Sequence, residues 1–444
     1  MKMNKPLFHI VPKKGWMNDP NGLVKFRDEY HVFYQADPEH LINETIGWGH
    51  YKSKDLLHWE ECPEAIFPDQ IYDRDGCFTG SGMVKDDCLY ILYTGHRNLE
   101  NGYVETQNIA WSEDGIQFKK YEGNPVIDLP PVDTTHRFRD PKLWEKNGKY
   151  YAVIGGENKK SWGKVVYYST EDLLHYTYCG VLAESDGQLG NMWECPNLTT
   201  IDGKDVLIIS PKGLKKEFGF SDFYESGYLL GCMDYENGKF EHGSYRRLDA
   251  GFDFYAPQVM ECEDRALLFA WFALPDSCGK ELEDGWRHLL TLPRELSISD
   301  SGNLCMNPIQ ELEALRGNRL VEKEVDDSWT WEIDNRPMEV ILEGDAQELT
   351  LTIADEAETF FECKYTKEGW SFRQKRNNEW KVSNVLLKER IRHQARLFLD
   401  YSTIEAFCEQ GEVVFSSRIY PAGKLSFSIK ESGKSKVKIY SLNM

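Results

Sequence analysis

A fivefold internal repeat is the feature of this 444-residue chain that most restricts its fold. Short apolar runs recur about sixty residues apart, and a turn signal rich in Asp, Asn, Gly and Lys precedes each one. A turn between two β-rich runs predicts a hairpin. The runs are His31–Gln35, Tyr90–Thr94, Tyr150–Ile154, Val206–Ser210 and Leu267–Trp271.

A second block recurs just before each hairpin, and four of its five copies carry proline at a matching place. Five repeats of several strands, with no helical periodicity between them, predict an all-β fold that begins with a five-bladed β-propeller. The first strand of each blade would line the central channel. Asp19, Asp140 and Glu194 should therefore converge from equivalent positions in blades one, three and four. The blocks are Asn18–Gly22, Phe78–Gly82, Arg139–Lys142, Glu194–Asn197 and Tyr255–Gln258.

The pattern changes after the fifth repeat. Ile309, Leu312 and Leu315 follow Pro308 at a spacing that suits a short connecting helix. Beyond it, apolar residues alternate with period two, which predicts an antiparallel β-sandwich that buries an apolar face against the propeller. We therefore predict a propeller over residues 1–305, a linker with a short helix over 306–320 and a C-terminal β-sandwich over 321–444.

Composition limits the function classes. The chain has 73 acidic and 52 basic residues, a net charge of −21, which argues against nucleic acid and anionic membranes as partners. No segment is apolar for the length that a bilayer requires, and residues 1–6 lack the apolar run of an export signal, so we predict a cytoplasmic protein. The 11 cysteines contain no Cys-x-x-Cys pair and indicate neither a disulfide framework nor a zinc site. The oligomeric state has no readable signature.

Three carboxylates on a propeller axis point to chemistry. Asp19 lies in an Asp-Pro-Asn-Gly sequence typical of a turn, but like charges gathered in a partly desolvated channel are costly and usually mark a function. A pair of carboxyl groups, one ionised and one protonated, suits glycoside hydrolysis: about 5–5.5 Å apart for retention of configuration, about 6.5–9.5 Å for inversion. Asp140, next to Arg139, is expected to stay ionised and to bind substrate hydroxyls.

Aromatic residues near the same blocks favour a sugar, which presents apolar faces together with hydroxyl groups. The Gly80-Ser81-Gly82 sequence is too short for a phosphate-binding loop and precedes no predicted helix, so nucleotide binding is not indicated. The aromatic residues are Trp16, Trp48, Phe78, Trp193, Phe254 and Tyr255.

Three motifs resemble the signatures of glycoside hydrolase family 32, the invertase, sucrose-6-phosphate hydrolase and fructanase family. They are Trp16–Gly22, Arg139–Pro141 and Trp193–Pro196, and the similarity extends to Gly47–His50, Gly251–Gln258, Thr291–Leu296 and Leu399–Glu405. The resemblance implies a retaining mechanism in which Asp19 attacks the anomeric carbon of a fructosyl unit. Glu194 would act as acid and then base, and Asp140 would stabilise the transition state.

The resemblance also implies which residues contact the substrate, and it implies no metal or organic cofactor. The partner would be a small-molecule fructoside such as sucrose, sucrose 6-phosphate or a short fructo-oligosaccharide, from which terminal β-D-fructofuranosyl units are released. The residues expected to bind it are Asn18, Gln35, Trp48, Phe78, Thr79, Arg139, Tyr255 and Trp271.

The departures from the family pattern lie around the substrate. Asn43–Gly47 replaces the family's Trp-Gly-Pro-Met-His, and Thr79 stands where the family commonly has serine. The leaving group is therefore left open by the sequence. The alternatives are a fructosyltransferase or a hydrolase of an unusual fructoside, an inverting arabinan-type propeller glycosidase, and a carbohydrate-binding propeller without catalysis.

Overall fold

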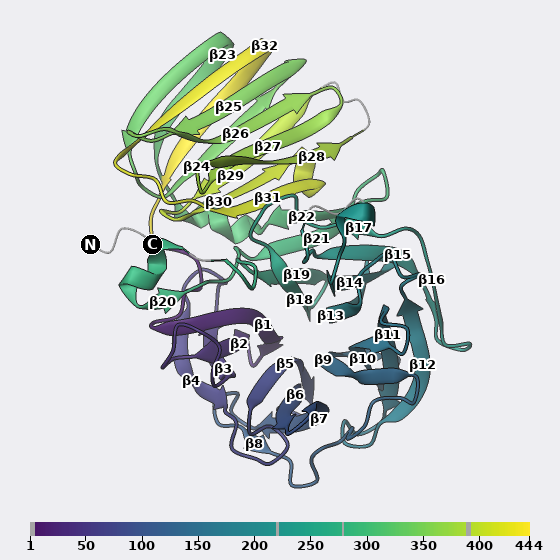
Figure 1. Cartoon of the computed structure of the whole chain (residues 1–444). Coiled ribbons are helices and arrows are strands. Elements are labelled where there is room, and N and C mark those ends of the chain that lie inside the picture. Colours follow the sequence, from purple (N-terminus) through teal and green to yellow (C-terminus); the bar gives the residue numbers. More distant parts are fainter. Residues whose placement is uncertain (1–4, 219–221, 278, 388–391) are drawn as a thin grey trace.

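The computed structural model describes residues 5–218, 222–277, 279–387 and 392–444. It confirms an all-β chain with a five-bladed propeller and a C-terminal β-sandwich (Figure 1). The first three blades are four-stranded meanders in which consecutive strands pair antiparallel. Their strands are β1 (Gly15–Phe26), β2 (Glu29–Asp37), β3 (Gly47–Ser53) and β4 (Glu60–Ile66); β5 (Gly76–Lys85), β6 (Cys88–Leu99), β7 (Gly102–Ser112) and β8 (Lys119–Lys120); and β9 (Thr134–Lys146), β10 (Lys149–Asn158), β11 (Gly163–Thr170) and β12 (Thr177–Glu184).

Blades four and five follow the same order with small additions. Blade four has the extra strand β17, which pairs with β15, and blade five has a loop with η2 and β20 between its second and third strands. The elements are β13 (Met192–Ile201), β14 (Lys204–Lys212), η1 (Lys216–Phe218), β15 (Gly227–Asp234), β16 (Lys239–His242) and β17 (Arg246–Arg247); then β18 (Tyr255–Cys262), β19 (Arg265–Trp271), η2 (Lys280–Asp284), β20 (Trp286–Arg287), β21 (Arg294–Ile298) and β22 (Leu304–Pro308).

The ring closes through the sheet of blade one. Strand β20, which lies within the chain of blade five, pairs parallel with the start of β1, where Gly15 faces Trp286 and Trp16 faces Arg287. Each predicted apolar run lies in the second strand of its blade: β2, β6, β10, β14 or β19. The first strands, β1, β5, β9, β13 and β18, surround the central axis (Figure 1).

The predicted connecting helix is the 3₁₀ helix η3 (Gln310–Leu315), which buries Leu312 and Leu315. The sandwich that follows does not consist of two separate sheets, because its ten described strands are joined in one hydrogen-bonded network. The strands are β23 (Arg316–Asp334), β24 (Met338–Gly344), β25 (Glu348–Ala354), β26 (Thr359–Thr366), β27 (Gly369–Arg376), β28 (Glu379–Leu386), β29 (His393–Leu399), β30 (Thr403–Cys408), β31 (Val413–Arg418) and β32 (Lys424–Leu442), with η4 (Glu409–Gly411) before β31.

Two long bent strands join the two layers of the sandwich. The first half of β32 pairs with β25 and its second half with β24, while β23 follows it along its length. The change of partner occurs at Gly433, which has a φ of 141°, opposite Asp327, which has a φ of 82°. The boundary prediction at residues 305 and 321 has no independent test and stays a prediction.

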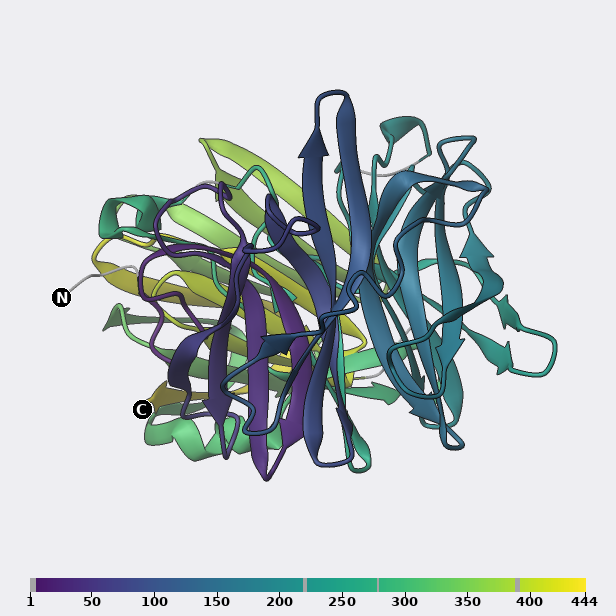
Figure 2. The ribbon, with the colours of Figure 1, turned by 90° about the horizontal axis from the view of Figure 1, so that it is seen from below.

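The sandwich packs against the propeller, as predicted, through an apolar face. Phe398, Phe407 and Val414 of the sandwich share one buried cluster with Leu267 and Phe269 of blade five. Viewed from below, the blades lie in front of the sandwich (Figure 2).

Charged residues cross the same interface. Fully buried Arg294 donates to Asp249 at 2.9 Å and to Glu405 at 2.6 Å. The ring of His9 lies between Asp400 at 2.8 Å and Glu405 at 2.9 Å. The interface therefore fixes the two units through paired buried charges as well as apolar contacts.

Candidate active site

A β-bulge in every innermost strand shapes the central cavity. Each of the five strands has a register shift against its second strand at the recurring block, so that one extra residue is inserted there. In a regular strand, adjacent side chains point to opposite faces, but at a bulge two neighbours can point the same way. Asn18 and Asp19 both line the cavity, as do Arg139 and Asp140.

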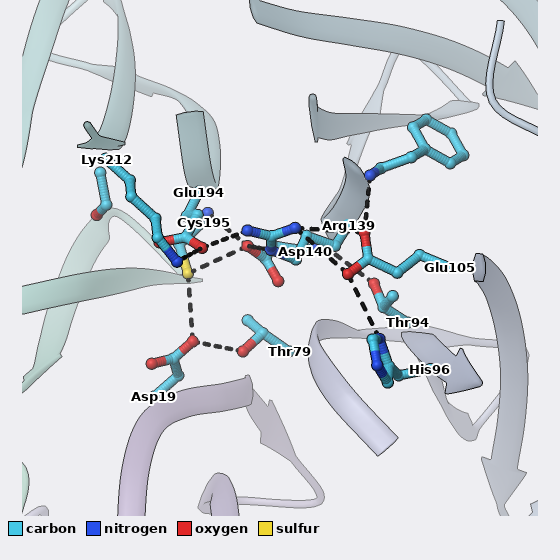
Figure 3. A network of polar contacts seen from close by, with 12 residues as sticks. Asp19, Thr79, Thr94, His96, Glu105, Arg139, Asp140, Glu194, Cys195 and Lys212 are labelled. Carbon is cyan, nitrogen blue, oxygen red and sulfur yellow. Dashed lines mark hydrogen bonds and ion pairs between the residues drawn. The ribbon is translucent and has the colours of Figure 1, made fainter. Parts of the chain in front are cut away.

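The bulges correct the predicted register of Glu194. Counted from the recurring proline, Asp19 and Asp140 hold the same position, but that position in blade four belongs to Cys195. Glu194 lies one residue earlier, at the position of Arg139. The three carboxylates still converge, because both positions of the bulge face the axis (Figure 3).

The cavity has a volume of about 370 Å³ and opens toward solvent. It is rich in acidic groups, since four carboxyl groups line it together with one guanidinium and one ammonium group. The lining residues are Trp16, Asn18, Asp19, Gln35, Asn43, Ile46, Phe78, Thr79, His96, Tyr103, Glu105, Arg139, Asp140, Glu194, Lys212, Tyr224, Tyr255, Trp271 and Pro275.

Asp19 is held by donors from two blades. The Thr79 hydroxyl donates to its Oδ2 at 2.6 Å, Asn18 Nδ2 donates to Oδ1 at 3.1 Å, and the Cys195 thiol lies 3.4 Å from Oδ2. Burial raises the pKa of Asp19 to about 6, with a further contribution from the negative charge of Glu194, while the Thr79 hydrogen bond opposes the rise. Asp19 therefore changes charge close to neutral pH.

Glu194 lies among positive and donating groups. Arg139 Nη2 donates to its Oε1 at 2.5 Å, Lys212 Nζ lies 3.7 Å from the same oxygen, and the Tyr255 hydroxyl donates to Oε2 at 2.6 Å. Burial alone would raise the pKa of Glu194, but the charges of Arg139 and Lys212 and these hydrogen bonds lower it to about 2. In the ligand-free cavity Glu194 is ionised.

The prediction that Arg139 keeps Asp140 ionised is wrong. Burial raises the pKa of Asp140 well above its usual range, and the charges of Glu194 and Asp19 add to the rise. Arg139 Nε lies 3.9 Å from Asp140, farther than its contact with Glu194, because the guanidinium extends across the cavity. Asp140 itself accepts a hydrogen bond from the backbone N–H of Cys195 at 3.0 Å.

Seven of the eight residues predicted to bind substrate line the cavity, and Trp48 does not. The Trp48 ring is fully buried beside Phe33 and Tyr93, and its indole N–H donates to the Phe78 carbonyl at 3.1 Å. It supports the wall that carries Phe78 and Thr79. The seven lining residues are Asn18, Gln35, Phe78, Thr79, Arg139, Tyr255 and Trp271.

Two charged lining residues lie outside the recurring blocks, and the sequence analysis missed them. Glu105, in the third strand of blade two, is buried, accepts from Arg139 at 3.3 Å and lies 3.6 Å from His96. Arg139 and the Phe138 backbone N–H bonded to Glu105 lower its pKa against the effect of burial. Lys212 ends the second strand of blade four. The sequence has no signal for Glu105, because it lies among the polar residues Glu105–Asn108 of β7.

The segment that departs from the family pattern reaches the cavity wall. Asn43 and Ile46 line the cavity, and the loop that carries them is fixed by Asp37. The Asp37 carboxylate accepts from the backbone N–H groups of Glu44 at 3.0 Å and Thr45 at 2.8 Å.

The described ranges contain no group of three or more His, Cys, Asp or Glu arranged to hold a metal ion. No described helix is long and apolar enough to cross a membrane.

Comparisons with known proteins agree with the geometry. Residues 9–308 match the model of the "Glycosyl hydrolases family 32 N-terminal domain", and residues 311–443 match that of the C-terminal domain. A sucrose-6-phosphate hydrolase of Bacillus subtilis is 36% identical over 454 residues, which cover 97% of this chain and 92% of that protein.

Two solved structures of an insect protein are also similar. The Bombyx mori GH32 beta-fructofuranosidase aligns at 35% identity with a TM-score of 0.90, covering 100% of this chain and 95% of that one. A mutant of the same protein in complex with sucrose aligns at 34% identity over the same shares of the two chains, again with a TM-score of 0.90.

Proposed function

We propose, on the premise that this chain belongs to glycoside hydrolase family 32 and is a glycosidase that releases fructosyl units, that Asp19 is its nucleophile and Glu194 its acid/base. The observation that carries the assignment is the convergence of both carboxylates on one cavity. The Cys195 thiol, 3.4 Å from Asp19, directly follows Glu194 in the chain. The retaining geometry, with the two carboxyl groups about 5–5.5 Å apart, is part of this proposal.

The reaction proceeds in two displacements. An Asp19 carboxylate oxygen attacks the anomeric carbon of the fructosyl unit, while Glu194 gives its proton to the departing glycosidic oxygen. Glu194, now ionised, then takes a proton from water, and the resulting nucleophile releases fructose from Asp19. Asp140 and Arg139 bind the sugar hydroxyls beside the reacting carbon.

Substrate must change the proton distribution in this cavity. Glu194 needs a proton to act as acid, yet in the empty cavity Arg139 holds it ionised. Sugar hydroxyls that accept from Arg139 weaken this ion pair and exclude water, and both effects raise the pKa of Glu194. Asp19 and Glu194 therefore titrate as a coupled pair, whose macroscopic pKa values belong to both.

The proposed substrates are sucrose, sucrose 6-phosphate and short fructo-oligosaccharides. Relatives named sucrose-6-phosphate hydrolase support sucrose 6-phosphate, and the similar structure in complex with sucrose supports sucrose. The comparisons do not favour transfer or binding without catalysis. In the test, purified protein is incubated with each substrate and the anomeric signal of newly released fructose is followed by NMR. Release of the β-anomer first is the expected result. Inversion, or no release from any substrate, refutes the proposal.

We also propose a cytoplasmic location. The ten described cysteines are free thiols, as expected for a reducing compartment. Cell fractionation with an antibody against the chain tests this, and recovery outside the cytoplasm refutes it.

A further inference from the structure

Lys212 is an unusual neighbour for a catalytic acid. Its ammonium group lies 3.7 Å from Glu194 Oε1, where a positive charge opposes protonation of the carboxyl group. In the absence of substrate Lys212 therefore favours the ionised form of Glu194, although an acid catalyst needs the protonated form. A function for Lys212 has to come from what it does once the cavity is occupied.

The ammonium group is available to a ligand. Among the residues that the structure describes, Lys212 Nζ has only the Glu194 contact, beyond hydrogen-bond distance, and a cation–π contact with Tyr224 at 5.6 Å. Its side chain is 32% exposed, and it ends β14 on the wall of the cavity. Lysine carries a compact charge on a flexible stem, which allows the group to turn toward a bound anion.

The other cation of the cavity is already engaged. Arg139 is buried and donates to both Glu105 and Glu194, so that its charge is balanced within the protein. The other acidic groups of the lining are Asp19 and Asp140. Of the two Lys and Arg residues in the described lining, Lys212 is therefore the one whose charge is not already balanced by hydrogen-bonded acids, so it can receive an anionic group.

Lys212 also lies on the side where the leaving group must sit. The proton donated by Glu194 goes to the glycosidic oxygen, so the leaving group lies on the Glu194 side of the anomeric carbon that Asp19 attacks. Lys212 and Tyr224 contact each other through the bridge at the end of β14, next to Glu194. Figure 3 shows the Lys212 side chain beside Glu194, away from Asp19 and Thr79.

We infer that Lys212 selects the leaving group: its ammonium group binds the phosphate of a 6-phosphorylated glucosyl unit and in doing so moves off Glu194. This rests on the proposed fructosyl-releasing function and assigns its anionic substrate class. A phosphate ester carries about −1.5 to −2 charges at neutral pH and accepts charge-assisted hydrogen bonds from lysine. Withdrawal of the positive charge makes Glu194 easier to protonate, so the anionic substrate itself prepares the acid.

The test compares kcat/KM for sucrose 6-phosphate and for sucrose in the full-length protein. In Lys212→Met the ratio of the two values falls roughly 10- to 100-fold, as expected for loss of a hydrogen bond to a charged group. Lys212→Arg keeps the positive charge, so its ratio of the two kcat/KM values stays close to that of the wild type. The matched control is Lys215→Met, which removes an exposed cation three residues away that is paired with Glu217 at 3.6 Å; it leaves the ratio unchanged.

A second measurement separates selection from mere stability. Glucose 6-phosphate inhibits the wild type more strongly than glucose does, and Lys212→Met removes this preference without a change in the circular dichroism spectrum. The basic limb of the sucrose pH profile moves to higher pH in Lys212→Met, because a cation next to Glu194 has been removed.

Three outcomes overturn the inference. An unchanged substrate ratio in folded Lys212→Met refutes the role of this residue. Wild-type activity on sucrose with none on sucrose 6-phosphate refutes the anionic substrate class but leaves the fructosyl-releasing function intact. Activity on neither substrate refutes the proposed function, and the inference falls with it.

Discussion

Thr79 offers the sharpest test of how the nucleophile is kept ionised. The buried Asp19 carboxylate has a pKa of about 6, and the Thr79 hydroxyl holds that value down by donating to Oδ2 at 2.6 Å. Thr79→Val keeps the shape of the side chain and removes the donor. A hydrogen bond to a charged group contributes about 1.5–3 kcal/mol, and one pKa unit corresponds to about 1.36 kcal/mol. The substitution should therefore raise the pKa of Asp19 by about 1–2 units.

The assay is the pH dependence of kcat at saturating sucrose, which reports the complex in which bound substrate has raised the pKa of Glu194. Asp19 must be ionised to attack, so activity rises with pH through its pKa, and the acid limb of the wild type lies near pH 6. In Thr79→Val the limb moves to about pH 7–8, and at pH 6 kcat falls about 5- to 50-fold through the smaller ionised fraction.

Thr79→Ser is the control, since it keeps the hydroxyl and should leave the limb in place. The reasoning is refuted if the acid limbs of Thr79→Val and the wild type coincide while both proteins are folded. A limb that moves to lower pH would also contradict it, because loss of a donor cannot favour the ionised carboxylate.

Four further predictions follow from the same contacts. Asp19→Ala abolishes fructose release without lowering the melting temperature, and full activity would overturn the nucleophile assignment. Glu194→Gln lowers kcat on sucrose about 10²- to 10⁴-fold, and much less on a 4-nitrophenyl fructoside, whose leaving group needs no proton; equal losses on both substrates would speak against an acid role. Glu105→Gln removes the second partner of Arg139, so the guanidinium pairs with Glu194 alone and the basic limb of kcat moves to lower pH; movement to higher pH contradicts this pairing. His9→Gln lowers the melting temperature more at pH 6 than at pH 9, whereas His40→Gln, at an exposed site, has little effect at either pH.

The sign of the His9 prediction follows from its partners. Burial lowers the pKa of His9, but the hydrogen bonds and charges of Asp400 and Glu405 outweigh it and raise the value above 6.5. The stabilisation is therefore complete below pH 6.5 and is lost as pH rises through the folded-state pKa. Breaking a buried ion pair costs about 3–5 kcal/mol, which calorimetry at pH 6 will detect. Equal losses at both pH values would show that the imidazole is not charged in the folded protein.

The propeller could be predicted because its repeat is local. The sequence of each blade indicates a hairpin within a few residues; Tyr90–Thr94, for example, directly follows a turn signal. Because the pattern occurs five times, each copy supports the same prediction of a propeller blade. The sandwich was predicted only as a class. Alternation in Leu425–Lys430 shows that one face is buried, but it carries no information about which strand pairs with it, and β32 in fact changes partner at Gly433.

The candidate site was predictable to the extent that its residues lie in the repeat. Asp19, Asp140 and Glu194 could be predicted because their blocks recur. Glu105 lies on the third strand of its blade and Lys212 on the second, and neither belongs to a recurring polar block. The charge states of these carboxyl groups could not be predicted from the sequence. Adjacency in the chain suggested that Arg139 pairs with Asp140, but the guanidinium reaches Glu194 across the axis instead.

In four blades a proline accompanies the bulge that brings polar groups to the cavity, and β5 forms the same bulge with Gly80 at that position. Proline has no N–H to give to the sheet, so a strand that carries it tends to break its ladder there, and a bulge is the least costly way to do so. The residues before three of the prolines, Asp140, Cys195 and Ala256, have φ values of 65°, 48° and 49°, a conformation that costs roughly 1–3 kcal/mol in a non-glycine residue. In these three blades that conformation accompanies the bulge, while β1 and β5 form the same bulge without it. Without a bulge in β9, Arg139 and Asp140 would lie on opposite faces of the strand, and the cavity would lose either the guanidinium that binds Glu194 or the carboxyl group beside it.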